Sequence, residues 1–287
     1  MKPVLYIAII ILYFSSFTKA QNIEHLSKVE DTLNSIAARI PNKLHDFERL
    51  SLNEEFKNVL LKALEEDGSM DFPFDSLNNV SVLTATDNSF RIMTWYIPLP
   101  DGTFEFFGFF QAKDERLETL NLYSLSDNVE ASDELIYKQL TFDNWHGAYY
   151  YRLIHTRHNR EDYYTLLGWR SDNMLTRKRI IEPLRLAAKG RPVFGVPLFT
   201  YEDNRYRRVV FEYSANINMF MDYERHSLFE TRRSHYMIVF DRVEPSHPKL
   251  KGHYQFYFPE TNIIDAFIFE NGRWVFYPEV DARNPSD

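Results

Sequence analysis

The stretch FRIMTWYIPLPDGTFEFFGFFQ, residues 90–111, decides the fold class of this chain. Two runs rich in aromatic and aliphatic residues flank Pro100-Asp101-Gly102, and Asp-Gly favours the positive φ angles that a tight hairpin turn needs. Over residues 104–110, phenylalanines fall at both odd and even positions, so both faces of the second run are apolar. The stretch therefore predicts a β-hairpin that is covered on both faces.

The same pattern recurs along the chain. Residues 149–156 and 163–169 flank a polar loop, and residues 264–270 and 273–280 flank Asn271-Gly272, a strong hairpin signal. Further strands are expected over 180–186, 192–199, 208–223, 235–243 and 253–258. No long helical pattern interrupts them, which favours a mainly β, antiparallel domain. Strands with two apolar faces suit a closed barrel, a sandwich-like stack of sheets or propeller-like blades.

The segment before residue 70 has the period of helices. Apolar residues recur at spacings of three and four over 26–40, and Pro41 is expected to end that helix. A second helix is expected to begin at the capping-box pair Ser51 and Glu54 and to end before Gly68. The sequence thus predicts an N-terminal helical hairpin over 21–70, followed by a β-rich domain over 80–287.

The first 20 residues have the pattern of a secretory signal peptide. A positive start at Lys2 precedes a 14-residue apolar stretch, 4–17, and the small-residue cleavage site Thr18-Lys19-Ala20. A membrane-spanning helix needs about 20 apolar residues, so this stretch is too short for an anchor. We expect an exported protein, periplasmic or extracellular, with no membrane span after the signal is cleaved.

Composition excludes several classes of protein. The chain has no cysteine, which removes disulfides, a lipid-modified cysteine, thiol catalysis and thiolate metal sites. Aromatic residues make up 16% of the chain and are expected to form most of the core. Two lysines belong to the signal, so 31 basic and 41 acidic residues remain, with a net charge of −10. This charge argues against nucleic acid as a partner.

Two local basic clusters do not change that conclusion. Arg177-Lys178-Arg179 and Arg205, Arg207 and Arg208 stand among acidic neighbours. We interpret both clusters as solvated faces.

Three strings carry a resemblance to a known group of proteins. YYTLLGW at 163–169, RVVFEYSA at 208–215 and IVFD at 238–241 resemble an uncharacterised family of exported proteins from Bacteroidota. The similarity runs from about residue 80 to residue 287. It implies a bacterial, exported setting and transfers no activity and no site residue.

Standard catalytic and cofactor motifs are missing from the sequence. It has no Gly-x-Ser-x-Gly elbow, no His-Glu-x-x-His zinc helix, no phosphate-binding loop and no Gly-x-Gly-x-x-Gly. His155 and His158 are three apart and bracket the end of an expected strand. Strand residues three apart face opposite ways, which disfavours joint metal ligation. No metal ion and no cofactor is expected.

The most suggestive row of side chains lies in residues 211–226. Odd positions from 211 to 223 are apolar, and even positions from 212 to 226 are polar except for Phe220, as in one long strand, or two strands joined by a bulge, with one packed face. The simplest interpretation of the polar positions is a solvent-exposed face. As a functional face, they offer the carboxylates Glu212, Asp222 and Glu224 as general acid or base, and the amides Asn216 and Asn218 as ligands for sugar hydroxyls or calcium.

A second candidate is the polar turn at residues 143–147. Trp145 and His146 stand there beside polar turn residues, where an aromatic face can stack on a sugar ring or a peptide. The alternative is that Trp145 closes the end of the sheet as part of the core.

Three functions remain open. The first is a β-rich bacterial envelope protein with a non-catalytic binding or structural role, whose partner is a glycan or an envelope protein. The second is a secreted or periplasmic hydrolase that acts on glycan or cell-wall material through the carboxylates. The third is a partner-binding subunit that uses the N-terminal helices, which requires an exposed apolar stripe formed by Leu26, Val29, Leu33 and Ile36.

Overall fold

The structure is a computed structural model, and it describes residues 22–114, 119–129, 132–201, 204–227 and 234–280. The expected signal peptide over 1–20 lies outside the described residues. The chain divides into two compact units between Val82 and Leu83. Among the described residues, no helix combines the length and the hydropathy that a membrane span requires.

The first unit contains the two predicted helices. The first helix covers residues 22–37, and the 3-10 turns η1 (Ile40–Asn42) and η2 (Ser69–Asp71) stand on either side of α2 (Asp46–Glu65). Pro41 lies in η1, past the end of the first helix, in agreement with its expected role as a helix breaker.

The predicted start of the second helix is wrong. The helix α2 begins at Asp46, and Asp46 and Glu48 place negative charge in its first turn, where the helix dipole favours it. Ser51 and Glu54 are exposed positions inside the helix. The capping pattern does not mark a helix end here, because the residues before it are helical as well.

The apolar stripe of the first helix is covered. Leu26, Leu33 and Ile36 are 1%, 0% and 3% exposed, and Val29 is half-buried. His25 Nε2 lies 3.1 Å from a carboxylate oxygen of Glu66, which joins the start of the first helix to the residue after α2. The exposed stripe that a partner-binding helix requires is therefore not found at these positions.

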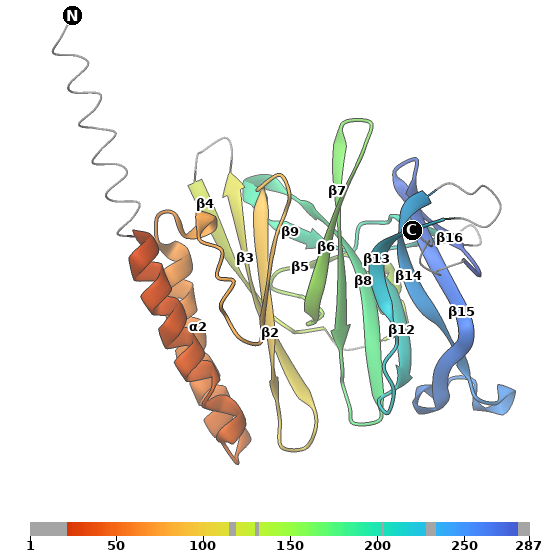
Figure 1. The fold of residues 1–287 in the computed structure, drawn as a ribbon, viewed down its shortest axis with the longest axis horizontal. Helices are drawn as coiled ribbons and strands as arrows, with labels where there is room; N and C mark the ends of the chain where they lie inside the picture. The colour runs from red at the N-terminus through yellow and green to blue at the C-terminus, as the bar shows by residue number, and fades with distance from the viewer. Residues whose placement is uncertain (1–21, 115–118, 130–131, 202–203, 228–233, 281–287) are drawn as a thin grey trace, which may run out of the picture. The chain divides into compact units, whose positions relative to one another are not determined.

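The β-strands form three sheets (Figure 1). The first sheet has the order β1-β2-β3-β4, with β1 (Val80–Thr84), β2 (Phe90–Pro98), β3 (Phe104–Asp114) and β4 (Thr119–Leu125). The second has the order β5-β9-β8-β7-β6, with β5 (Leu140–Thr141), β6 (Tyr149–His158), β7 (Glu161–Arg170), β8 (Thr176–Leu186) and β9 (Pro192–Phe194), and β12 (Val209–Ser214) also pairs with β8. The third has the order β11-β10-β16-β15-β14-β13, with β10 (Phe199–Tyr201), β11 (Asn204–Tyr206), β13 (Met221–Ser227), β14 (Ser234–Pro245), β15 (Tyr257–Glu270) and β16 (Arg273–Tyr277). The second unit also contains the 3-10 turns η3 (Asp133–Tyr137), η4 (Ala188–Gly190), η5 (Pro248–Leu250) and η6 (Tyr254–Phe256).

The three predicted hairpins are confirmed as β2–β3, β6–β7 and β15–β16. Gly102 has a φ of 84°, and Asn271 and Gly272 have φ angles of 51° and 79°, so the Asp-Gly and Asn-Gly turns use the backbone region that their residues favour. The β6–β7 turn is shorter than expected, because only Asn159 and Arg160 separate the two strands. Where the register of the described strands is given, the pairing is antiparallel as predicted, except that β10 runs parallel to β16.

Two apolar cores cover the two faces of the second sheet. In the first core, Phe90 of β2 lies 4.8 Å from Phe110 of β3 and 4.9 Å from Tyr164 of β7, measured between ring centroids. In the second core, Phe211 of β12 lies 4.6 Å from Phe240 of β14. The second sheet is thus covered on both sides, which explains its strands with two apolar faces and favours the stack of sheets among the three predicted arrangements.

The row at residues 211–226 is split between two sheets. β12 belongs to the second sheet and β13 to the third, and residues 215–220 connect them, so the chain forms neither one long strand nor two strands joined by a bulge. Apart from Ala215, the odd-numbered apolar side chains of the row contact the second core, from opposite sides: Phe211, Tyr213, Ile217, Met219, Met221 and Tyr223. The alternation continues across the break because both strands face one core.

Candidate functional site

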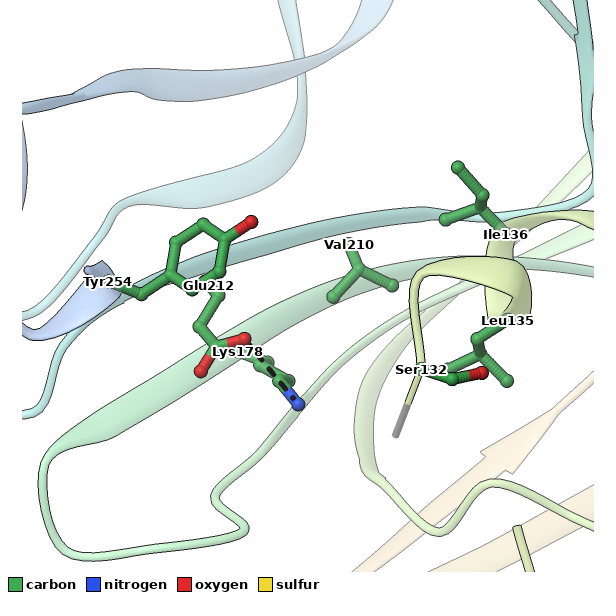
Figure 2. Close-up of a pocket in the computed structure, with 7 residues that line it drawn as sticks. All are labelled: Ser132, Leu135, Ile136, Lys178, Val210, Glu212 and Tyr254. Carbon is green, nitrogen blue, oxygen red and sulfur yellow. Dashed lines mark ion pairs between the residues drawn. The ribbon is translucent and has the colours of Figure 1, made fainter. Parts of the chain in front are cut away.

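A pocket of about 390 Å³ opens where β12 pairs with β8 (Figure 2). It is lined by Ser132, Leu135, Ile136, Lys178, Val210, Glu212 and Tyr254. Figure 2 shows Tyr254, Glu212 and Lys178 at one end and the residues around η3 at the other, with Val210 between them. Its volume falls within the range of about 300–1,000 Å³ that small-molecule sites occupy.

The register of the two strands positions the polar end of the pocket. Glu212 stands directly opposite Lys178 in the β12–β8 ladder, and Val210, two residues along, faces the same side. Phe211 and Tyr213 point the other way, into the second core. The predicted alternation therefore turns Glu212 away from that core and toward the pocket.

Charged side chains of alternating sign extend from the pocket into the protein, and we call them the charge network: Asp127, Arg170, Asp172, Lys178 and Glu212. Lys178 Nζ lies 2.5 Å from an oxygen of Asp172 and 3.6 Å from one of Glu212. Arg170 contacts Asp172 at 2.5 Å and Asp127 at 3.1 Å. Three carboxylates and two cations leave a net charge of −1. Of these five residues, Glu212 and Lys178 line the pocket, which thus offers a ligand both an acceptor and a donor of hydrogen bonds.

Thr176 and Asp172 fix the positions of charged groups in this network. Thr176 Oγ1 donates a hydrogen bond of 2.6 Å to Glu212 and so orients the carboxylate. Burial acts to raise the pKa of Asp172, but the charge of Arg170 and the hydrogen bond from Lys178 outweigh it and keep that pKa below its ordinary value. Asp172 is therefore ionised at neutral pH and pairs with both cations.

His146 lies beneath the same network. Its side chain is fully buried, and Nδ1 stands 3.1 Å from the carbonyl oxygen of Val129 and 3.5 Å from Arg170. Burial, together with the nearby charge of Arg170, lowers the pKa of His146 to about 3. The neutral ring donates from Nδ1 to Val129, and Nε2 has no hydrogen-bond partner among the described residues.

The structure brings two of the predicted site residues to one region and separates the others. Glu212 lines the pocket, and His146 approaches Arg170 in the charge network. Trp145 is 0% exposed, and its indole N–H donates a hydrogen bond to Tyr150 in the first core. Trp145 and His146 therefore present no exposed surface to a ligand.

The remaining candidates lie on or next to the third sheet. Asp222 receives two hydrogen bonds of 2.9 Å from Arg152, and Glu224 lies 2.9 Å from His226. Burial acts to raise the pKa of Asp222, but the bonds from Arg152 outweigh it and lower that pKa. Asn216 and Asn218 are exposed in the connection 215–220. None of these four described residues lines the pocket.

The interpretation of the two basic clusters as solvated faces is wrong for one residue in each. Lys178 is 7% exposed, and Arg208 is 0% exposed, where it forms hydrogen bonds of 2.8 and 3.1 Å with Glu182. Lys178 and Glu182 fall at alternate positions of β8, with the core residue Ile180 between them. That period-two position among core residues is the signal that marks them as inward-facing.

Tyr254 of the pocket gave no sequence signal. It lies in a segment predicted as a strand, and the structure forms the turn η6 there. No family model, no curated protein and no solved structure matches the chain. The function is therefore inferred from the geometry of the chain itself.

Proposed function

We propose that this chain is an exported protein of a bacterial envelope that binds a sugar unit of a glycan without cleaving it. The observation that carries the proposal is the cross-strand pair Glu212–Lys178 beside the exposed ring of Tyr254. The exported setting rests on the signal-peptide pattern of residues 1–20.

The pocket combines the two kinds of contact that sugars use. Tyr254 is 37% exposed and offers a ring face for the apolar side of a sugar. The Glu212 carboxylate accepts hydrogen bonds from hydroxyl groups, and the Lys178 ammonium donates one. Leu135 and Val210 contribute apolar surface to the wall of the pocket. Charge-assisted hydrogen bonds of this kind contribute about 1.5–3 kcal/mol each.

Binding is favoured over hydrolysis by the number of carboxylates. Most glycosidases need two carboxyl groups that flank the scissile bond. Among the described residues, Glu212 is the one carboxylate that lines this pocket, while Asp172 pairs with Lys178 and Arg170. A hydrolase that uses Glu212 as its acid or base remains the second candidate.

A glycan-binding experiment with matched variants tests the proposal. The purified protein is screened on an array of bacterial cell-surface glycans, and each hit is measured by titration calorimetry. We expect Glu212→Gln and Tyr254→Ala to weaken binding about tenfold or more, because each removes one of the two kinds of contact. Glu224→Gln, a carboxylate change outside the pocket, should leave binding unchanged.

Three results would count against the proposal. The first is that no glycan binds the unaltered protein, and the second is that both pocket variants bind as it does. The third is release of product from a bound glycan that is lost in Glu212→Gln, which would support the hydrolase. The exported setting has its own test, which is amino-terminal sequencing of the mature protein, with a start at Gln21 expected.

A further inference from the structure

A second cluster of ligand-type side chains lies at the end of the β6–β7 hairpin, outside the pocket. Asp87 in the turn before β2, His155 on β6 and Asp162 on β7 each offer one ligand atom, and these three atoms lie within 4.8 Å of one another. His155 Nε2 is 2.8 Å from Asp162 Oδ1. Three segments of the chain therefore converge on one point.

The ligand side chains are oriented by neighbours. His155 Nδ1 lies 2.6 Å from Thr86 Oγ1, so both ring nitrogens are engaged. Asp87 accepts a hydrogen bond of 2.5 Å from the hydroxyl of Tyr164, whose ring packs in the first core. Outer hydrogen bonds of this kind fix the orientation of histidine and carboxylate ligands in metal sites.

The charge of the cluster favours a cation. Two carboxylates face one imidazole, and the cation Arg157, 3.6 Å from Asp162, is 67% exposed.

We propose that Asp87, His155 and Asp162 form a binding site for a divalent transition-metal ion of the Zn²⁺ class. An imidazole with carboxylates suits these ions, whereas Ca²⁺ takes six to eight oxygen ligands. Zn²⁺ binds such donors at about 2.0–2.2 Å in a tetrahedron, which places neighbouring donors roughly 3.4 Å apart. The His155–Asp162 pair then opens by about half an ångström, and water takes the fourth position.

The site uses one histidine because of strand geometry. His158 is three residues beyond His155 on β6 and faces the other way, toward Gly272, where an added Cβ would lie 3.2 Å from its ring. The sequence expectation that these two histidines do not share a metal is consistent with this placement. The partners of His155 are instead Asp87, from the preceding sheet, and Asp162, across the hairpin.

Metal titrations of the full chain without an affinity tag test the proposal. Calorimetry with Zn²⁺ should give one ion per chain, and Co²⁺ should produce a visible absorption band from the bound ion. We expect His155→Ala and Asp162→Asn to weaken Zn²⁺ binding at least about tenfold and to abolish the band. His158→Ala, on the same hairpin, should bind as the unaltered protein does.

Asp162→Asn keeps the shape of the side chain, so it serves if His155→Ala does not fold. Absence of Zn²⁺ binding by the unaltered protein would overturn the proposal. Equal Zn²⁺ binding by Asp162→Asn would overturn it as well, and so would Ca²⁺ binding as tight as that of Zn²⁺.

Discussion

Replacement of His146 by asparagine should reduce the dependence of stability on pH. The pKa of His146 is lowered from 6.5 to about 3 in the folded protein, by burial and then by the charge of Arg170. Between these two values the unfolded chain binds a proton that the folded protein does not bind. The contribution of His146 to stability is therefore complete above about pH 6.5 and is lost as the pH falls toward 3.

The size of the effect follows from this shift. One proton changes the free energy of unfolding by about 1.4 kcal/mol per pH unit, so His146 accounts for a loss of about 2 kcal/mol between pH 8 and pH 5. The full shift corresponds to about 5 kcal/mol and is reached only below pH 3. The pKa of Asp172 is lowered from 3.8, so its titration changes the free energy of unfolding only below the range from pH 8 to pH 5.

Urea unfolding at a series of pH values measures the loss. All four tryptophans lie in the second unit, so their fluorescence reports the unit that contains His146. Asparagine keeps a donor near the position of Nδ1 for Val129 and does not titrate. The variant and the unaltered protein are therefore compared by the slope of the free energy of unfolding against pH, and not by their absolute stability. If the His146→Asn variant loses as much stability between pH 8 and pH 5 as the unaltered protein, the burial argument for His146 is refuted.

Three other substitutions test the packing of the second unit, all by urea unfolding at neutral pH. Glu182→Gln should cost about 3–5 kcal/mol, because it leaves the fully buried Arg208 without its countercharge; a cost below 1 kcal/mol would show that water reaches the pair. Gly168→Ala should cost about 1–3 kcal/mol, since the new Cβ would lie 2.6 Å from the ring of the buried Tyr150; an unchanged midpoint would contradict that contact. Gly272→Ala should cost roughly 1 kcal/mol, because its φ of 79° strains an alanine; a gain in stability would mean that the turn changes its conformation.

Local signals were sufficient for the hairpins and for the faces of the strands. Asp101-Gly102 and Asn271-Gly272 need only their own backbone preferences to form turns, and the structure places Gly102, Asn271 and Gly272 at positive φ. Alternation over 211–226 also reports which side chains face a core. It does not report the sheet to which a strand belongs, since that depends on pairing with distant strands.

The candidate sites depend on those distant pairings. Alternation alone identified Glu212 as a residue that faces away from the core. Lys178 became part of the site only through the β8–β12 register, which no local pattern specifies. Asp87 and His155 are likewise far apart in sequence, and they meet because a turn of one sheet approaches a hairpin of the next. The sequence therefore indicates single residues of each region but not the groups they form.

The position of β16 has a consequence for the order in which the protein forms. β16 follows every other strand of the third sheet along the chain, yet it lies between β10 and β15. Until a ribosome has added Tyr277, β10 lacks its parallel neighbour and the edge of β15 is open. Truncation before Arg273 would leave two unpaired edges, which are sites for aggregation. The third sheet can therefore be completed only after nearly the whole chain has been synthesised. The second core, which that sheet covers, is fully buried only then.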